Sequence, residues 1–154
     1  MTPTCDNSNP RYQALIQLLR TAEDIWNASR VFFERWRLSP SQFNILNVLF
    51  DAPRGGTQIE LSRQLIMNRS NATGLIDRLE ARGLVQRTAI PGNRRAHQVI
   101  LTPVGRELVR EILPEYCRLG GTVWDGLSDE HMSRTVTSLL RVSENVKAIA
   151  ASLK

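Results

Sequence analysis

Apolar side chains recur at helical spacing over two long stretches at the ends of the chain. In residues 11–37 they fall three or four positions apart, and the apolar stripe is broad for one helix. We expect a helix there that projects beyond a small core and buries part of its stripe against another chain. A last helix begins at Ser128, and its apolar face comprises Met132, Val136, Leu139, Leu140, Val146, Ile149 and Leu153.

Three shorter helices are predicted between residues 39 and 83. Ser39 and Gln42 form a capping box around Pro40, and Thr57 and Glu60 form a second one. Breakers in residues 51–56 separate these two helices. Asn68 is the predicted cap of a helix over residues 69–82, and Gly83 supplies the left-handed residue that ends it. The inward side of that helix is predicted to comprise Ala72, Leu75, Ile76 and Leu79.

Two short strands follow, over residues 84–89 and 96–101, with a hairpin tip at residues 91–95. Val85, Val99 and Leu101 are expected to face the core, and His97 shares their parity, which favours a packed or hydrogen-bonded structural histidine. A fifth helix starts at Thr102-Pro103, and Pro114 and Gly120-Gly121 are expected to bend or interrupt it. This order of elements predicts a mainly α chain containing a winged helix-turn-helix, with a two-stranded hairpin as its wing.

Length and composition suit one compact cytoplasmic domain. The chain has 154 residues, 42% of them hydrophobic, and no stretch reaches the roughly 20 apolar residues that a membrane span needs. Residues 1–10 are polar and are expected to form a flexible tail rather than a signal peptide. Cys5 and Cys117 lack the spacing of a zinc site or a disulfide framework, and His97 and His131 lack metal-ligand partners nearby. We expect no metal, no cofactor and no enzyme activity.

The positive charge is concentrated in one central segment. The whole chain has a net charge of +5. Residues outside 54–95 balance to zero, so the entire excess lies within that range. Its basic residues are Arg54, Arg63, Arg69, Arg78, Arg82, Arg87, Arg94 and Arg95, and its acidic ones are Glu60, Asp77 and Glu80. Arginine suits phosphates and guanine edges, which indicates a polyanionic partner, and charge alone indicates a solvated basic face equally well.

The same segment resembles the recognition region of the MarR family of transcriptional regulators. The resemblance lies in residues 59–65, 68–87 and 93–105, and the order of the flanking helices agrees over nearly the whole chain. It implies a winged helix-turn-helix over residues 38–102. It also implies a helical dimerisation region formed by residues 11–37 and 103–154.

The resemblance also implies which residues contact DNA. A recognition helix reads base edges in the major groove with its N-terminal residues, while an arginine at the wing tip can enter the minor groove. The matching positions are Arg69, Ser70, Asn71, Thr73, Gly74 and Arg78 on the helix, and Asn93, Arg94 and Arg95 at the wing. Asn93 departs from the aspartate usual in the family, which puts an ion pair at the wing in doubt. Arg95 is the first candidate for the minor groove and Arg94 for a phosphate.

Three roles in this region stay open at the level of sequence. Gly74 allows either a close approach of the DNA backbone or helix packing. Arg78 and Arg82 lie one helical turn apart and either contact phosphates or solvate the helix. Asp77 has no partner at helical spacing, which favours a tertiary pair with an arginine. Trp26, Phe33, Trp36 and Phe43 suit the core and an effector pocket equally, so the effector-binding residues stay unknown.

The expected function is that of a dimeric, sequence-specific DNA-binding regulator. The partners implied are an inverted-repeat operator in double-stranded DNA, a second copy of the chain, and a small aromatic or phenolic effector that releases a repressor. No membrane partner is expected. One alternative is a redox-sensing regulator that uses Cys5 or Cys117. Another is a helical adaptor whose basic face binds acidic proteins.

Overall fold

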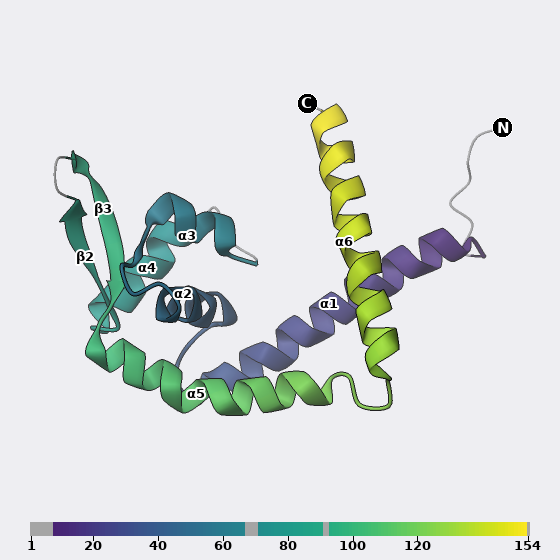
Figure 1. Cartoon of the computed structure of the whole chain (residues 1–154), viewed down its shortest axis with the longest axis horizontal. Coiled ribbons are helices and arrows are strands. Elements are labelled where there is room, and N and C mark those ends of the chain that lie inside the picture. The colour runs from purple at the N-terminus through teal and green to yellow at the C-terminus, as the bar shows by residue number, and fades with distance from the viewer. Residues whose placement is uncertain (1–7, 67–70, 91–92, 154) are drawn as a thin grey trace. The chain divides into compact units, whose positions relative to one another are not determined.

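The computed structural model describes residues 8–66, 71–90 and 93–153, and the side chains of 93–96 lie outside that description (Figure 1). The chain forms two compact units, Met1–Arg110 and Glu111–Lys154. The boundary falls inside the fifth helix. The division proposed from sequence, at residues 37/38 and 102/103, is one of function and stays a prediction.

Among its described residues, the first unit contains four complete helices. They are α1 Pro10–Glu34, α2 Pro40–Phe50, α3 Gln58–Gln64 and α4 Ala72–Ala81. Both predicted capping boxes are formed, by Ser39 with Gln42 at α2 and by Thr57 with Glu60 at α3. Asn68, the predicted cap of α4, lies outside the described residues. The left-handed end of α4 at Gly83 is confirmed by its φ of 67°.

The turn after α1 has a left-handed residue of a less usual kind. Arg37 has a φ of 52° and is the one non-glycine residue with positive φ in the described part of the chain. Its N–H donates to Glu34 O at 2.8 Å, and the N–H of Leu38 donates to Phe33 O at 3.2 Å. These bonds form a Schellman motif, in which glycine is the usual residue at the left-handed position. A side chain there costs roughly 1–2 kcal/mol.

The sheet has three antiparallel strands in the order β1-β3-β2. They are β1 Gly56–Thr57, β2 Val85–Ile90 and β3 Asn93–Leu101. The predicted hairpin is therefore present, but β1 was not predicted, because its two residues follow a run of turn formers. Gly55 makes the approach possible: at φ 75°, a Cβ on it would lie 2.2 Å from Val99 O.

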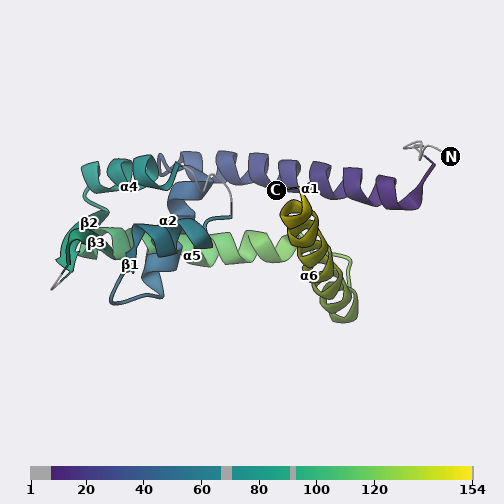
Figure 2. The same ribbon diagram turned by 90° about the horizontal axis from the view of Figure 1, so that it is seen from above.

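The core of the first unit lies between the short helices and the base of the hairpin, and the far part of the hairpin extends past α2, α3 and α4 in both views (Figures 1 and 2). The rings of Phe33 and Phe43 stack at 4.5 Å between centroids. All four predicted inward residues of α4 are buried, as are Val85 and Val99, while Leu101 is half-buried.

The second unit holds the end of α5 Pro103–Thr122 and the whole of α6 Asp129–Ser152. Pro114 was expected to bend or interrupt α5, and the helix continues through it without interruption. The helix ends directly after Gly120-Gly121, as the breakers indicate. No residue of α6 is buried, so its predicted apolar face lies exposed. Among the described residues, no helix is both long enough and apolar enough to cross a membrane.

Candidate nucleic-acid interface

The packing of α4 decides which of its residues face outward. Ala72 and Leu75 are buried on its inner side, so Asn71 and Thr73 are exposed at its N-terminal end. Two of the predicted DNA contacts therefore share an accessible helix terminus, which is the part of a recognition helix that reaches base edges. The neighbouring predicted contacts, Arg69 and Ser70, lie outside the described residues.

Thr73 is held in place from the preceding helix. The amide nitrogen of Gln58, at the start of α3, donates a hydrogen bond to the hydroxyl oxygen of Thr73. Because Thr73 accepts in this bond, its own hydroxyl hydrogen is still available for an acceptor outside the protein. Sequence reasoning missed Gln58, since the two residues are 15 positions apart and nothing in their spacing indicates contact.

Asn71 and Gly74 lie against each other on the first turn of α4. Asn71 occupies the N-cap position, yet its side chain makes no capping hydrogen bond. Among the described residues, the atoms nearest to a Cβ on Gly74 would be the Oδ1 of Asn71 at 2.8 Å, the Cγ of Asn71 at 3.8 Å and an Nη of Arg78 at 3.9 Å. Gly74 thus makes room for the Asn71 amide.

Arg78 and Arg82 differ, although both are exposed on α4. Within the described residues Arg78 has no hydrogen bond or ion pair, which leaves its guanidinium available to solvent or phosphate. Arg82 instead donates to two backbone oxygens, that of Arg37 at 2.7 Å and that of Trp36 at 2.9 Å. The sequence suggested two roles for Arg82, contact with a phosphate or solvation of the helix. The structure shows a third, a hydrogen-bonded contact with the end of α1.

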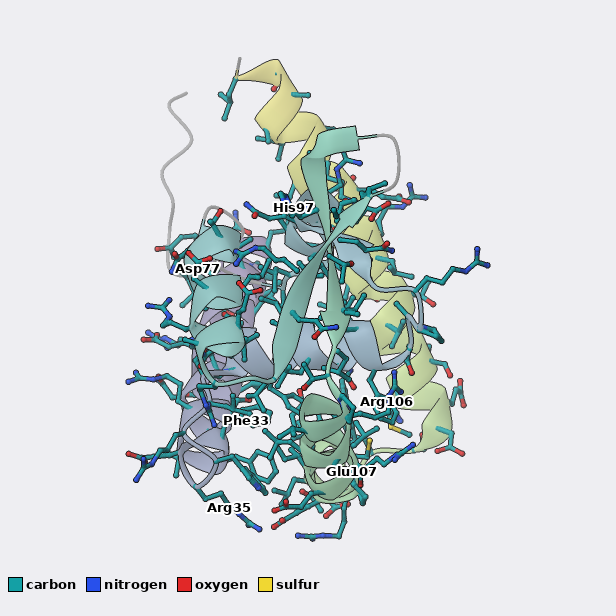
Figure 3. All side chains as sticks on the ribbon, turned by 90° about the vertical axis from the view of Figure 1, so that its left-hand side faces the viewer. Phe33, Arg35, Asp77, His97, Arg106 and Glu107 are labelled. Carbon is teal, nitrogen blue, oxygen red and sulfur yellow. The ribbon has the colours of Figure 1, made fainter. Side chains whose placement is uncertain are left out.

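An ion-pair network joins α4 to the first strand of the wing. The Arg87 guanidinium on β2 pairs with both Asp77 and Glu80, and its backbone N–H donates to Glu80 Oε1 at 2.8 Å. The prediction that Asp77 pairs with an arginine distant in sequence is therefore confirmed. Figure 3 labels Asp77 on α4. Burial works to lower the pKa of Arg87, but hydrogen bonds from its guanidinium to the two carboxylates outweigh it and raise the pKa.

The wing residues Asn93, Arg94 and Arg95 lie at the start of β3, where the structure describes the backbone and not the side chains. His97, two residues further on, is exposed on the hairpin (Figure 3), so the expectation of a packed histidine is wrong. Its parity matches Val99, but this part of the strand extends beyond the core and both of its sides meet solvent. Its side chain forms no hydrogen bond with any residue described.

The described part of the chain includes one of the two cysteines. Cys117 is exposed on α5, and Cys5 lies outside the described residues. In the described ranges no three His, Cys, Asp or Glu side chains are grouped so that they could hold a metal ion. His131 is exposed, as expected, with Nδ1 at 2.7 Å from the hydroxyl of the cap residue Ser128.

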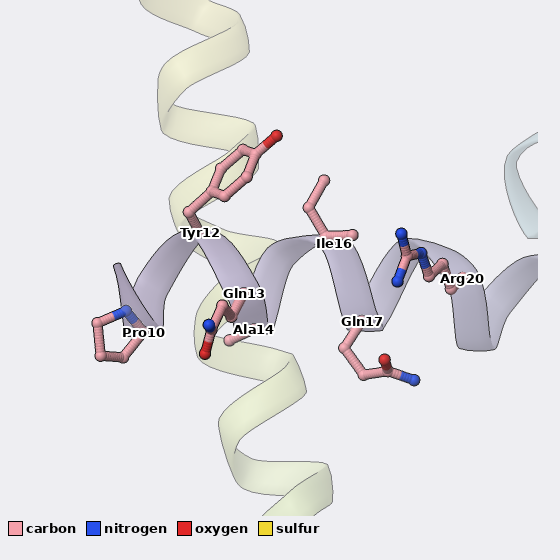
Figure 4. Close-up of a pocket in the computed structure, with 7 residues that line it drawn as sticks. All are labelled: Pro10, Tyr12, Gln13, Ala14, Ile16, Gln17 and Arg20. Atoms are coloured by element: carbon pink, nitrogen blue, oxygen red, sulfur yellow. The ribbon is translucent and has the colours of Figure 1, made fainter. Parts of the chain in front are cut away.

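Two hollows lie along α1. One, of about 670 Å³, is lined by residues of α1 alone, from Pro10 to Arg20 (Figure 4). The other, of about 530 Å³, lies where α1 leads into α2 and has Asn27, Arg30, Glu34 and Arg37 in its lining. Both linings include polar or charged side chains, and neither includes Trp26, Phe33, Trp36 or Phe43, the aromatic residues that suit an effector pocket.

Comparison with known proteins finds transcriptional regulators that this chain resembles. Residues 38–97 match the model of the MarR family. An uncharacterised HTH-type transcriptional regulator of Bacillus subtilis, YsmB, is 27% identical over 131 residues, which cover 84% of this chain and 88% of that protein. The transcriptional repressor MprA of Escherichia coli is 39% identical over 69 residues, or 45% of this chain and 39% of the repressor.

Solved structures share the fold of the chain. Sco3205 of Streptomyces coelicolor, a MarR-family regulator in complex with DNA, superposes with a TM-score of 0.79 at 23% identity, covering 89% of this chain and 88% of its own. BpsR of Bordetella bronchiseptica, whose DNA binding is regulated by 6-hydroxynicotinic acid, gives a TM-score of 0.70 at 27% identity over 82% of this chain and 91% of its own.

Proposed function

We propose that this chain, whose residues 38–97 match the model of the MarR family, is a winged helix-turn-helix regulator that represses transcription as a homodimer on an inverted-repeat DNA site. One observation carries the proposal. The N-terminal end of α4 exposes Asn71 and Thr73, a pair of hydrogen-bonding side chains, within the one segment that holds the excess of arginine. Side chains of this kind read base edges, and the surrounding charge attracts phosphates.

The proposed contacts differ in the part of the DNA that each residue touches. Arg69, Ser70, Asn71 and Thr73 contact base edges or nearby phosphates in the major groove, and Gly74 lets that turn approach the duplex. Arg78 contacts a phosphate. At the wing, Asn93 supports the turn, Arg94 contacts a phosphate and Arg95 enters the minor groove, where a narrow A·T-rich groove has an enhanced negative potential.

Apolar surface outside the winged helix supports the homodimer. Leu19 on α1 is 57% exposed and Ile149 on α6 is 58% exposed, and both belong to longer apolar faces of those helices. Faces of this kind are unfavourable in water unless another chain covers them. A two-fold dimer would place its recognition helices about 34–36 Å apart, one turn of DNA.

The effector is proposed to be a small aromatic or phenolic compound. The support is BpsR, whose DNA binding is regulated by a hydroxylated aromatic acid. If the compound binds one arrangement of the dimer better than another, effector and DNA affinity are coupled reciprocally. Titration of 6-hydroxynicotinic acid and simple hydroxybenzoates into the protein–DNA complex tests this, and retention of the complex at saturating concentrations of every compound counts against it.

The DNA-binding proposal is tested with the purified protein, DNA from upstream of its own gene, and random DNA of equal length, across a salt series. We expect tight binding to one site and a logarithmic salt slope that reports several phosphates. Arg95→Ala should weaken that binding and relax the A·T preference beside the half-sites. Weak and equal affinity for the two DNAs would instead indicate a basic surface without sequence preference, as in an adaptor that binds acidic proteins.

A further inference from the structure

Arg82 stands at the C-terminal end of α4 and bonds to a turn 45 residues earlier in the chain. Its Nη1 donates to the carbonyl of Arg37 and its Nη2 donates to the carbonyl of Trp36. A guanidinium presents its donors in one rigid plane, so two bonds to consecutive carbonyls fix its direction as well as its position. The contact is therefore a defined joint between two segments and not a loose surface pair.

The turn that Arg82 contacts has carbonyls to satisfy. The Schellman bonds of Arg37 and Leu38 engage the carbonyls of Glu34 and Phe33, and the last carbonyls of a helix have no partner within it. Arg82 supplies donors to two later carbonyls of the same turn, those of Trp36 and Arg37, and its positive charge compensates the negative end of the α1 dipole. The two hydrogen bonds from Arg82 also help to hold the strained backbone of Arg37, the residue with positive φ.

We propose that Arg82 is a positioning residue for DNA reading, because it ties the C-terminal end of α4 to the end of α1. This inference rests on the proposed function. The other end of α4 carries Asn71 and Thr73, so a shift of the anchored end changes where those side chains meet the bases. Because α1 belongs to the proposed dimerisation region, the joint also transmits the dimer geometry to α4.

The competing role for Arg82 is direct contact with a phosphate, and the salt slope separates the two. Since a substitution removes one phosphate contact from each subunit of the proposed dimer, replacement of a phosphate ligand should reduce the magnitude of the logarithmic salt slope by about 1.8, or about 0.9 per contact. Arg78→Met is expected to do so, with a similar loss of affinity on the upstream and random DNAs. Arg82→Met is expected to leave the slope unchanged and to weaken binding to the preferred site by about tenfold, the scale of couplings through packed networks. Random DNA should show little change.

A second variant separates positioning from simple support of the turn. Glycine adopts a φ of 52° without the penalty of a side chain, so Arg37→Gly should hold the turn without Arg82. The double variant Arg37→Gly/Arg82→Met should regain thermal stability toward that of Arg37→Gly alone while its specific affinity stays low. Affinity is compared per folded molecule, as determined by circular dichroism at the assay temperature.

Three results would overturn the inference: unchanged affinity in Arg82→Met, a reduced salt slope in that variant, or recovery of specific affinity in the double variant. The first gives Arg82 no part in DNA binding, the second makes it a phosphate ligand, and the third makes it a support of the turn only. Failure of the wild-type protein to prefer any upstream site would instead contradict the proposed function.

Discussion

Asn71 occupies the N-cap of α4 without capping it. Asparagine is favoured at this position because its side-chain oxygen accepts a backbone N–H of the first turn. Here that oxygen lies over Gly74 instead, at a place that a Cβ would enter. An amide released from capping and kept exposed retains both a donor and an acceptor for a base edge, and the pair suits adenine.

This geometry predicts that Asn71→Ala and Gly74→Ala cause the same kind of defect. Loss of the Asn71 amide should cost about 1–3 kcal/mol on the preferred site, the value of one good base contact, and little on random DNA. Gly74→Ala should imitate it, because the new methyl group displaces the amide. Binding titrations on both DNAs measure the difference. If Gly74→Ala weakens binding to the two DNAs equally, the role of Gly74 is to allow close approach to the DNA backbone. If Asn71→Ala weakens binding to both DNAs equally, Asn71 does not read bases.

Outward polar residues on the recognition helix were predictable, and their partners were not. Asn71 and Thr73 follow from helical periodicity, since Ala72, Leu75 and Ile76 fix the inner side. The pairing of Asp77 with an arginine also followed, because no partner existed at helical spacing. The contacts of Gln58 and Arg82 depend on how segments 15 and 45 residues away fold back, and no local pattern contains that information.

At the scale of elements, capping chemistry predicted more than periodicity alone. Both capping boxes and the glycine end of α4 follow from a few side chains whose hydrogen bonds are local. The errors arose where tertiary context decides. β1 exists only because β3 passes beside it, and His97 is exposed because the hairpin outruns the core. Pro114 is accommodated within α5, whose helix continues on both sides of it.

The capping box of α3 predicts a specific pH dependence. Hydrogen bonds from the backbone and then the hydroxyl of Thr57 hold the pKa of Glu60 below its ordinary value of 4.5. A carboxylate with a lowered folded-state pKa stabilises the protein above its unfolded pKa, and that stabilisation disappears as the pH falls through the folded value. At neutral pH the wild-type protein should therefore have a higher melting temperature than Glu60→Gln, and this difference in melting temperature, the gap, should shrink below about pH 4.5.

Thermal melts of both proteins between pH 3 and 7 measure this gap. Glutamine keeps an acceptor for the capping box and removes only the titration, so the comparison isolates the charge. Glu23→Gln, on the exposed surface of α1, makes the same change in net charge away from a cap. A gap between wild type and Glu60→Gln that stays constant down to pH 3 would show that the cap does not depend on the ionised form.

At the scale of the whole molecule, α6 is the element whose sequence and surroundings disagree most. Its 24 residues carry an apolar face, yet none of them is buried within the chain. An amphipathic helix gains its stability in water mainly by packing that face. A second copy of the chain is the partner that the family relationship and the exposed face of α1 both favour, so α6 is where the homodimer should be most sensitive to substitution.

Val146 and Ala148 provide a matched pair for this prediction. Both are exposed on α6. Residues two positions apart in an α-helix are separated by about 200° around the helix axis, so these two lie on nearly opposite sides. Val146→Asp places a charge on the apolar face and should shift the protein from dimer to monomer at micromolar concentration, with a loss of operator affinity far greater than that of random DNA. Ala148→Asp adds the same charge to the polar side and should remain dimeric. Sedimentation equilibrium gives the mass of each. A monomeric wild type would remove the basis for an inverted-repeat operator, and a dimeric Val146→Asp would place the interface away from this face of α6.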